Sequence, residues 1–364
     1  MAILILSCES ESVFTPKKTL AFKDRVILEI DSMTKRSSKY VGYCEQLKSI
    51  YIFNETNYKL YFYDVESAEN WKIIPFEKSG PKRVGKIDGI YVLNQDSIFF
   101  LNGFGNYVSL LNSRAEHMAK YEIFENNNAG HFIQTRSPSF KYSRSTKTLH
   151  IPIISSQKIN SKETKSAMNY SLDSHEKELY KAWPSNFRKY GGKGRISYMA
   201  HNYEKSICVF SYTIDESIHV YDFKNSITTM HYAGSNKIKK PEYYKGGTGI
   251  HEKALHQRTQ SWFGNIHYDK YQQIYLRSAS IAKRVPKGVN PLSSNLKTVH
   301  GDEVYVITIL LSENFEKIGE VPHVMLPNSA FSTPNGLYVT DSQYQKENED
   351  IMVFKRFEIK NIPQ

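Results

Sequence analysis

The sequence predicts an all-β protein, a six-bladed β-propeller that is closed by its own N-terminal strand. Two observations carry this prediction. Short runs rich in β-branched and aromatic residues, bounded by Gly, Asn, Asp, Ser or Pro, follow one another with hardly any helical periodicity. These runs also group into similar units at a spacing typical of propeller blades, each of which is one four-stranded antiparallel sheet.

The hairpin of residues 206–223 shows the plan of one unit. Two runs rich in β-branched and aromatic residues flank a polar turn at 215–217. The second run alternates, with Ile218 and Val220 on one face and Tyr221 on the other, and this alternation predicts a β-strand.

Six units follow one another along the chain. They span residues 40–75, 85–123, 137–183, 195–232, 262–323 and 325–359. The last unit is one strand short, and we expect the strand 26–30 at the other end of the chain to complete it. This closure favours one propeller domain over residues 20–364, preceded by a leader over residues 1–19. A two-sheet sandwich is the competing fold.

Composition limits the function classes. Hydrophobic residues make up 40% of the chain and aromatic residues 13%, which is enough for a substantial core. The formal net charge of +11 indicates an acidic partner or an anionic surface, or simply a soluble surface. No basic run is interleaved with aromatic residues as in a nucleic-acid module, so we do not expect a nucleic-acid partner.

The three cysteines suggest no disulfide framework and no zinc site, because their number is odd and none forms a Cys-x-x-Cys pair. We expect Cys44 and Cys208 to be small buried residues of strands. Cys8 follows the apolar run 2–6 and precedes a polar, acidic stretch, as in the signal of a bacterial lipoprotein. Lipid on Cys8 would anchor the protein to the outer membrane or cell surface.

The Cys8 segment departs from such a signal in three ways. It has no basic residues at its start, its apolar run is short, and Leu6 fits the pattern loosely. A start codon assigned too late would explain the first two departures. The alternative is an ordinary apolar tail with a stray cysteine.

Three stretches carry a resemblance to a known family. They are Ile74-Pro75-Phe76-Glu77-Lys78-Ser79-Gly80-Pro81 followed by Val84-Gly85, Trp183-Pro184-Ser185 with Gly191-Gly192, and Asn265-Ile266-His267-Tyr268-Asp269-Lys270-Tyr271 before Ile274-Tyr275-Leu276-Arg277. With these stretches the chain resembles the TolB-like six-bladed propeller lipoproteins of Bacteroidetes, a family known chiefly as a domain of unknown function. The resemblance implies a propeller and a cell-envelope location, and it transfers no catalytic residue.

The loops that precede the innermost strands are the best candidates for a binding site, because in a propeller they meet on one face around the axis. They are rich in Lys and Arg and poor in acidic residues. We expect these side chains to bind an anionic glycan, a peptide or an envelope protein. The guanidinium groups would bind carboxylates, sulfates or phosphates, and the aromatic rings would be stacking surfaces. The candidate ligand-binding residues are Arg136, Tyr190, Arg195, Arg258 and Trp262. Alternatively, the lysines and arginines serve only solubility.

No catalytic or cofactor motif emerges from the sequence. The glycine clusters at 191–194 and 246–249 lack the spacing of a phosphate-binding loop, and the spacing of His251, His256 and His267 fits no zinc enzyme. We therefore expect no cofactor and no metal, and a monomeric binding or scaffold module rather than an enzyme. A hydrolase or lyase with an axial active site stays open as the alternative, because fold alone does not decide function.

Overall fold

We describe the protein from a computed structural model. The structure describes residues 14–31, 34, 40–80, 82–103, 105–124, 131–133, 140–155, 165–182, 197–238, 240–242, 249, 252, 255–256, 259–281, 306–324, 326–341, 344 and 350–363. All structural statements below concern these residues.

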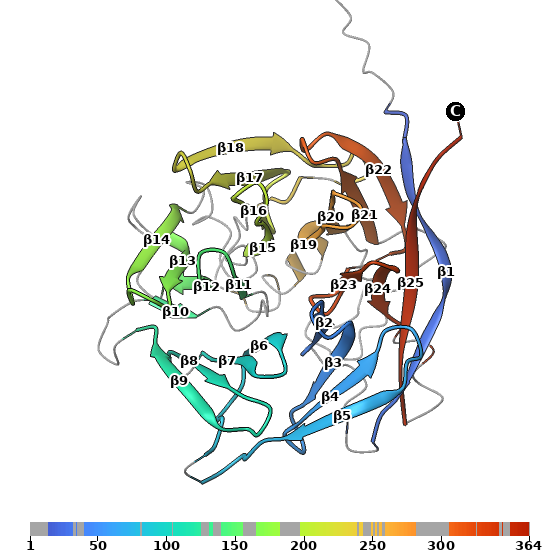
Figure 1. Cartoon of the computed structure of the whole chain (residues 1–364). Coiled ribbons are helices and arrows are strands. Elements are labelled where there is room, and N and C mark those ends of the chain that lie inside the picture. Colours follow the sequence, from blue (N-terminus) through green and yellow to red (C-terminus); the bar gives the residue numbers. More distant parts are fainter. Residues whose placement is uncertain are drawn as a thin grey trace, which may run out of the picture.

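Six antiparallel sheets stand around a central axis and form the predicted six-bladed propeller (Figure 1). Blade 1 contains β2 (Val41–Cys44), β3 (Ser49–Asn54), β4 (Lys59–Asp64) and β5 (Asn70–Pro75). Blade 2 contains β6 (Gly89–Asn94), β7 (Ser97–Asn102), β8 (Tyr107–Leu111) and β9 (His117–Glu122). In both blades the first strand lies nearest the axis and the last lies at the rim.

Blades 4 and 5 repeat this order. Blade 4 contains β15 (Ser197–Asn202), β16 (Ile207–Tyr212), β17 (Ser217–Asp222) and β18 (Ile227–Tyr232). Blade 5 contains β19 (Trp262–Asp269), β20 (Ile274–Ser280), β21 (Val306–Leu311) and β22 (Lys317–Pro322). These four units thus fall close to the limits that the sequence predicts.

Blade 3 departs from the common plan because its inner strand is split. It contains β10 (His131–Ile133), β11 (Lys141–Ser143), β12 (Thr148–Ser155), β13 (Lys165–Ser171) and β14 (Lys177–Ala182). Both β10 and β11 pair with β12, on either side of Ile151 and Pro152. Since Pro152 has no amide hydrogen, it cannot donate to a continuous inner strand at this point. The inner strand resumes with β11, whose first residue is Lys141.

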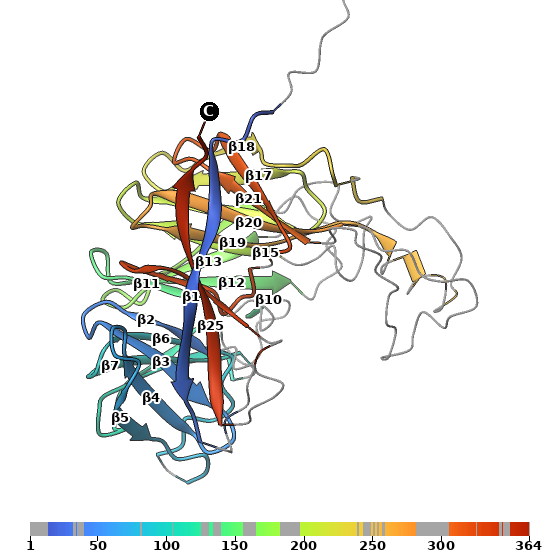
Figure 2. The same cartoon turned by 90° about the vertical axis from the view of Figure 1, so that its right-hand side faces the viewer.

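Blade 6 closes the ring with the two ends of the chain. Its strands are β23 (Phe331–Thr333), β24 (Gly336–Thr340), β25 (Ile351–Asn361) and β1 (Lys18–Glu29), in that order. Figure 1 shows β1 and β25 side by side along one edge of the molecule, the side that faces the viewer in Figure 2. The prediction that an N-terminal strand completes the last blade is confirmed.

The closing strand is longer than the segment 26–30 that the sequence suggests. A β-bulge between Phe22 and Asp24 shifts the register, so the alternation of buried and exposed residues breaks in mid-strand. The first half of β1 is therefore not recognisable as part of the same strand from the sequence. The N-terminal part of β1 also reaches blade 5. The carbonyl oxygen of Lys18 occupies the space that a side chain at Gly319 would need, so this close approach requires glycine.

The core is divided into six clusters, one at each interface between neighbouring blades. The hairpin of residues 206–223 shows why. Ile218 and Val220 pack towards blade 5, whereas Tyr221 packs towards blade 3, so both faces of one strand are buried. This double burial explains the many strands that are apolar on both faces.

The described cysteines are buried and unpaired, as the sequence predicts. Burial raises the pKa of the Cys44 thiol and that of the Cys208 thiol, since an apolar environment disfavours the thiolate. Both therefore act as small core residues. Over the described part of the chain, no helix has the length and the apolar character needed to span a membrane.

Candidate functional site

A cavity of about 720 Å³ occupies the central channel of the propeller. Its volume is typical of small-molecule sites, which occupy roughly 300–1,000 Å³. All six blades contribute aromatic rings to the described lining, from the inner strands or the residues next to them. One such ring from each blade, in chain order, belongs to Tyr43, Tyr91, Tyr142, Tyr203, Tyr268 and Phe331.

Lys141 places a positive charge in this cavity. It is the first residue of β11, so the split inner strand of blade 3 fixes its position. Its side chain is half-buried, and no hydrogen bond or ion pair joins it to another described residue. Burial lowers the pKa of the Lys141 ammonium, because the channel replaces only part of the water that stabilises the charge.

The charge of Lys141 reaches residues of two other blades. Burial and the nearby Lys141 lower the pKa of His267 on β19 to about 3. Burial, the neighbouring His150 and Lys141 lower the pKa of His201 on β15 well below its usual value. Both histidines line the cavity and are neutral at pH 7, so they do not add to its positive charge.

His201 has one ring nitrogen without a partner. The Cys208 sulfur lies 3.5 Å from Nε2, whereas the buried Nδ1 has no hydrogen-bond partner among the described residues. Buried polar atoms in proteins are normally paired, so an unpaired one in a cavity wall is a candidate ligand contact.

The rings of blade 4 form a short stack at the cavity wall. The ring of His201 is nearly parallel to that of Tyr203 at 13°, with the centroids 5.7 Å apart. The His201 ring is also nearly parallel to that of Phe223, at 11° and 6.3 Å, and the centroid of the His150 ring lies 4.3 Å from that of the His201 ring. Tyr203 is 40% exposed and lines the cavity, so its ring can contact a planar ligand.

The turns that follow the inner strands form one mouth of the channel. Glu45 in blade 1 forms an ion pair with Lys270 in blade 5, and the Tyr271 hydroxyl lies 3.5 Å from the Glu45 carboxylate. All three residues line the cavity. These contacts compensate the charge of Lys270, in contrast to that of Lys141.

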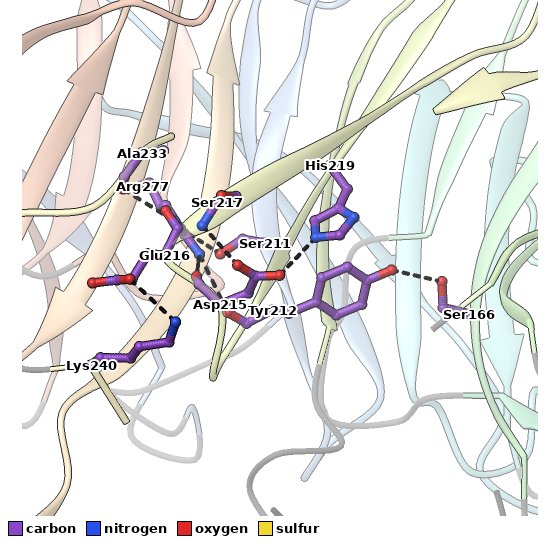
Figure 3. A network of polar contacts seen from close by, with 10 residues as sticks. All are labelled: Ser166, Ser211, Tyr212, Asp215, Glu216, Ser217, His219, Ala233, Lys240 and Arg277. Carbon is purple, nitrogen blue, oxygen red and sulfur yellow. Dashed lines mark hydrogen bonds and ion pairs between the residues drawn. The ribbon is translucent and has the colours of Figure 1, made fainter. Parts of the chain in front are cut away.

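A second buried cation, Arg277 on β20, lies between blades 4 and 5 (Figure 3). Its five N–H groups all donate hydrogen bonds. The acceptors are the Ser211 hydroxyl and the carbonyl oxygens of Tyr212, Asp215, Glu216 and Ala233, at 2.5–3.3 Å. The guanidinium carbon also lies 4.0 Å from the ring centroid of Phe263.

Arg277 is a structural residue. Burial lowers its pKa to about 9, and the charges of Asp215 and Glu216 act in the opposite direction, so the side chain stays protonated at pH 7. Its hydrogen bonds fix the turn between β16 and β17 to blade 5. Asp215 in turn holds Nε2 of His219 at 2.8 Å.

The comparisons with known proteins agree with this architecture. Residues 17–322 match the family described as Domain of unknown function (DUF4221). The chain belongs to this family. A search of curated proteins found no match.

Solved structures show the same fold. A DUF4221 member from Bacteroides vulgatus is 19% identical, with a TM-score of 0.78, and the alignment covers 95% of this chain and 99% of that one. A Bacteroides fragilis protein whose name describes it as exported is 10% identical, with a TM-score of 0.54 and coverage of 95% and 96%. At these identities the similarity shows the fold alone.

The structure describes one of the five ligand-binding residues that the sequence predicts for this DUF4221 propeller. Trp262 begins β19 and packs, partly buried, against the core between blades 3 and 4, and it does not line the cavity. Arg136, Tyr190, Arg195 and Arg258, like Cys8, lie outside the described residues, so these predictions stay predictions.

Sequence reasoning missed Lys141. The predicted ligand-binding residues were chosen from the loops before the inner strands, whereas Lys141 belongs to an inner strand itself. The available signal was a lysine between Phe140 and Tyr142, directly before a hairpin turn. A lysine flanked by strand residues is common at surfaces, so only the position of β11 at the axis reveals its role.

A metal or catalytic centre has little support in the described channel. Among the described residues, no group of three His, Cys, Asp or Glu side chains could hold a metal ion. His267 Nε2 lies 2.8 Å from the Ser332 hydroxyl, the contact that comes closest to a nucleophile with its base. Since the His267 pKa is about 3, its ring is too weak a base to activate Ser332 at neutral pH.

Proposed function

We propose that the protein is a non-catalytic binding protein of the bacterial cell envelope, and that it holds an anionic ligand in its central channel. One observation carries the proposal, the Lys141 ammonium that has no partner among the described residues. A charge inside a protein is costly unless an opposite charge or several hydrogen bonds compensate it. An anion bound in the cavity supplies both.

The basic loops before the inner strands have a supporting role in this proposal. If they lie near the axis as the sequence predicts, Arg136, Arg195 and Arg258 would add positive potential there, and Tyr190 would be a stacking surface. Such potential raises the association rate of anions and is weakened by salt. An acidic glycan, a peptide or an envelope protein that carries the bound group would contact these loops as well.

The proposed location rests on Cys8 and its surroundings. Lipid on Cys8 would tether the propeller to the outer membrane or cell surface, as in TolB-like lipoproteins of Bacteroidetes. The name of the Bacteroides fragilis neighbour, which describes that protein as exported, agrees with this location. To test it, Cys8→Ser and the natural chain are expressed in a Bacteroides host and the cells are fractionated. We expect only the natural chain in the membrane fraction, and equal membrane content of the two proteins would refute the anchor.

The channel is tested by binding of acidic and neutral glycans and small organic acids to the full chain, at low and high salt. We expect saturable binding of acidic compounds that weakens about tenfold or more in Lys141→Met, because a hydrogen bond to a charged group contributes about 1.5–3 kcal/mol. Lys224→Met is the matched control, since Lys224 is exposed on the outer turn of blade 4. It should bind like the natural chain.

Variants of the loops separate the two parts of the proposal. Combined Arg195→Glu and Arg258→Glu should lower the association rate at low salt and have little effect at high salt. If this double variant abolishes binding while Lys141→Met leaves it unchanged, the site lies on the loops and the channel proposal is wrong. If no acidic compound binds, anion binding itself is refuted for this panel and a protein partner becomes the next candidate.

A further inference from the structure

We infer that the anion held in the channel is an aromatic monocarboxylate. This inference rests on the proposed function and goes beyond it by naming the class of ligand. It follows from three properties of the cavity: its internal charge, the polar groups that are still free, and the rings that surround them.

The first property is the charge inside the channel. Lys141 contributes one positive charge, whereas His201 and His267 are neutral at pH 7 because burial lowers their pKa values. At the mouth, the Glu45 carboxylate already compensates Lys270. The described lining also contains the exposed Arg144 and Glu204, so its three cations and two carboxylates carry a net charge of +1. One negative charge on the ligand therefore neutralises the described lining.

The second property concerns the polar side chains of the lining. Several polar side chains of the lining are engaged within the protein. The Asn265 amide donates to the carbonyl oxygen of Pro327 at 3.2 Å, and Ser332 contacts His267 at 2.8 Å. The Ser143 hydroxyl accepts a hydrogen bond from Thr146 at 2.8 Å. A sugar ring carries many hydroxyl groups, and these engaged side chains offer it few partners.

Lys141 and His201 Nδ1 are free of partners among the described residues, and both belong to cavity-lining side chains. The Lys141 ammonium suits one oxygen of a carboxylate. His201 Nδ1 is buried, so it donates to the second oxygen only if the ring turns towards the ligand and carries its proton on Nδ1. The neighbouring Cys208 sulfur, 3.5 Å from Nε2, is compatible with that tautomer as a weak S–H donor.

The third property is the aromatic wall. The Tyr203 ring, 40% exposed, is nearly parallel to that of His201, which is also nearly parallel to that of Phe223. On the side of blade 2, the Tyr91 ring lies edge-on to Phe140 and Tyr142, each with centroids 6.4 Å apart. A flat aromatic body can extend the Tyr203 stack and meet these rings, as aromatic pairs prefer offset or edge-to-face contact.

The cavity is too large for the smallest carboxylic acids to fill. About 720 Å³ leaves most of the space empty around an acetate ion. A fused aromatic acid fills more of it and displaces more water from the rings, which favours binding. 2-Naphthoate is therefore the probe, with 2-naphthamide as its neutral counterpart.

The experiment is isothermal titration calorimetry of the full chain with four compounds: 2-naphthoate, 2-naphthamide, 2-naphthyl phosphate and D-glucuronate. We expect 1:1 binding of 2-naphthoate, at least about tenfold tighter than that of the other three. Tyr203→Leu should weaken 2-naphthoate binding by roughly twofold to tenfold, the range expected for one aromatic contact. Lys141→Met should reduce 2-naphthoate to the affinity of 2-naphthamide, and Lys224→Met should change nothing.

The outcomes separate this inference from the proposed function. If D-glucuronate or 2-naphthyl phosphate binds more tightly than 2-naphthoate and depends on Lys141, the channel is an anion site and the aromatic monocarboxylate is wrong. If 2-naphthoate and 2-naphthamide bind equally and Lys141→Met has no effect, both proposals fail. Binding of none of the four compounds overturns this inference, while the wider panel of acids still tests the proposed function.

Discussion

Arg277 and Lys141 each place a positive charge inside the propeller, one between blades 4 and 5 and the other in the central channel. Arg277 is fully buried and uses all five donors on acceptors of blade 4. Lys141 is half-buried beside a cavity and has no partner among the described residues. A cation whose donors are all used can only hold the fold together, whereas one that faces an open cavity can bind a ligand.

The largest expected effect on stability comes from replacing Arg277, the cation whose donors are all used. Arg277→Leu would leave five acceptors between blades 4 and 5 without their donor, and we expect a loss of about 3–5 kcal/mol in the free energy of unfolding. Arg277→Lys keeps the charge but cannot reach all five acceptors, so it should lose part of that amount. Urea unfolding monitored by circular dichroism measures both.

Lys240→Met is the control for the Arg277 variants. Lys240 is exposed and lies 3.9 Å from Glu216, a residue of the same network. Its removal should change stability by less than about 0.5 kcal/mol. A loss below about 1 kcal/mol in Arg277→Leu would contradict the structural role of Arg277.

In the absence of ligand, Lys141→Met should increase the stability of the fold, by less than Arg277→Leu decreases it. At neutral pH the unpaired ammonium destabilises the folded state, so replacing it with an uncharged side chain of similar length should raise the melting temperature. Scanning calorimetry of the natural chain, Lys141→Met and Lys224→Met measures this gain. A lower melting temperature of Lys141→Met than of Lys224→Met would show that Lys141 stabilises the fold, against our interpretation.

The pH dependence of that gain follows from the lowered pKa of Lys141. Below the folded-state pKa both states are protonated, and the penalty is fully present. Between the folded-state pKa and the unfolded value of 10.5, the unfolded chain binds more protons, so the natural chain gains stability as the pH rises. The advantage of Lys141→Met should therefore shrink as the pH approaches 10.5. A difference that is independent of pH would contradict this account.

Much of the fold could be predicted because the strands follow from patterns of neighbouring residues. The alternation of Ile218, Val220 and Tyr221 predicts a strand wherever its partners lie, and the missing strand of the sixth unit requires a partner from the other end of the chain. The first half of β1 escaped prediction because the bulge between Phe22 and Asp24 breaks the two-residue period on which such reasoning depends.

The candidate site could be predicted only in its general character. The positive charge and the aromatic residues pointed to an anion near the axis, but four of the five residues chosen for it came from predicted loops, and the fifth, Trp262, begins β19 and does not line the cavity. Lys141, His201 and His267 are far apart in the sequence, and each is unremarkable in its own strand. Their proximity depends on the ring closing around one axis, which no local pattern encodes.

The sequence by itself determined the strands and their grouping into six blades, because alternation and turn residues act over a few neighbours. The strand missing from the sixth unit then pointed to the N-terminal segment as its partner. Only the tertiary structure decided which of the two buried cations is satisfied. Arg277, within a stretch that carried the family resemblance, meets the carbonyl groups of blade 4, and Lys141 meets a cavity. Hydrogen-bond partners and burial are non-local properties, and they separate a structural charge from one available to a ligand.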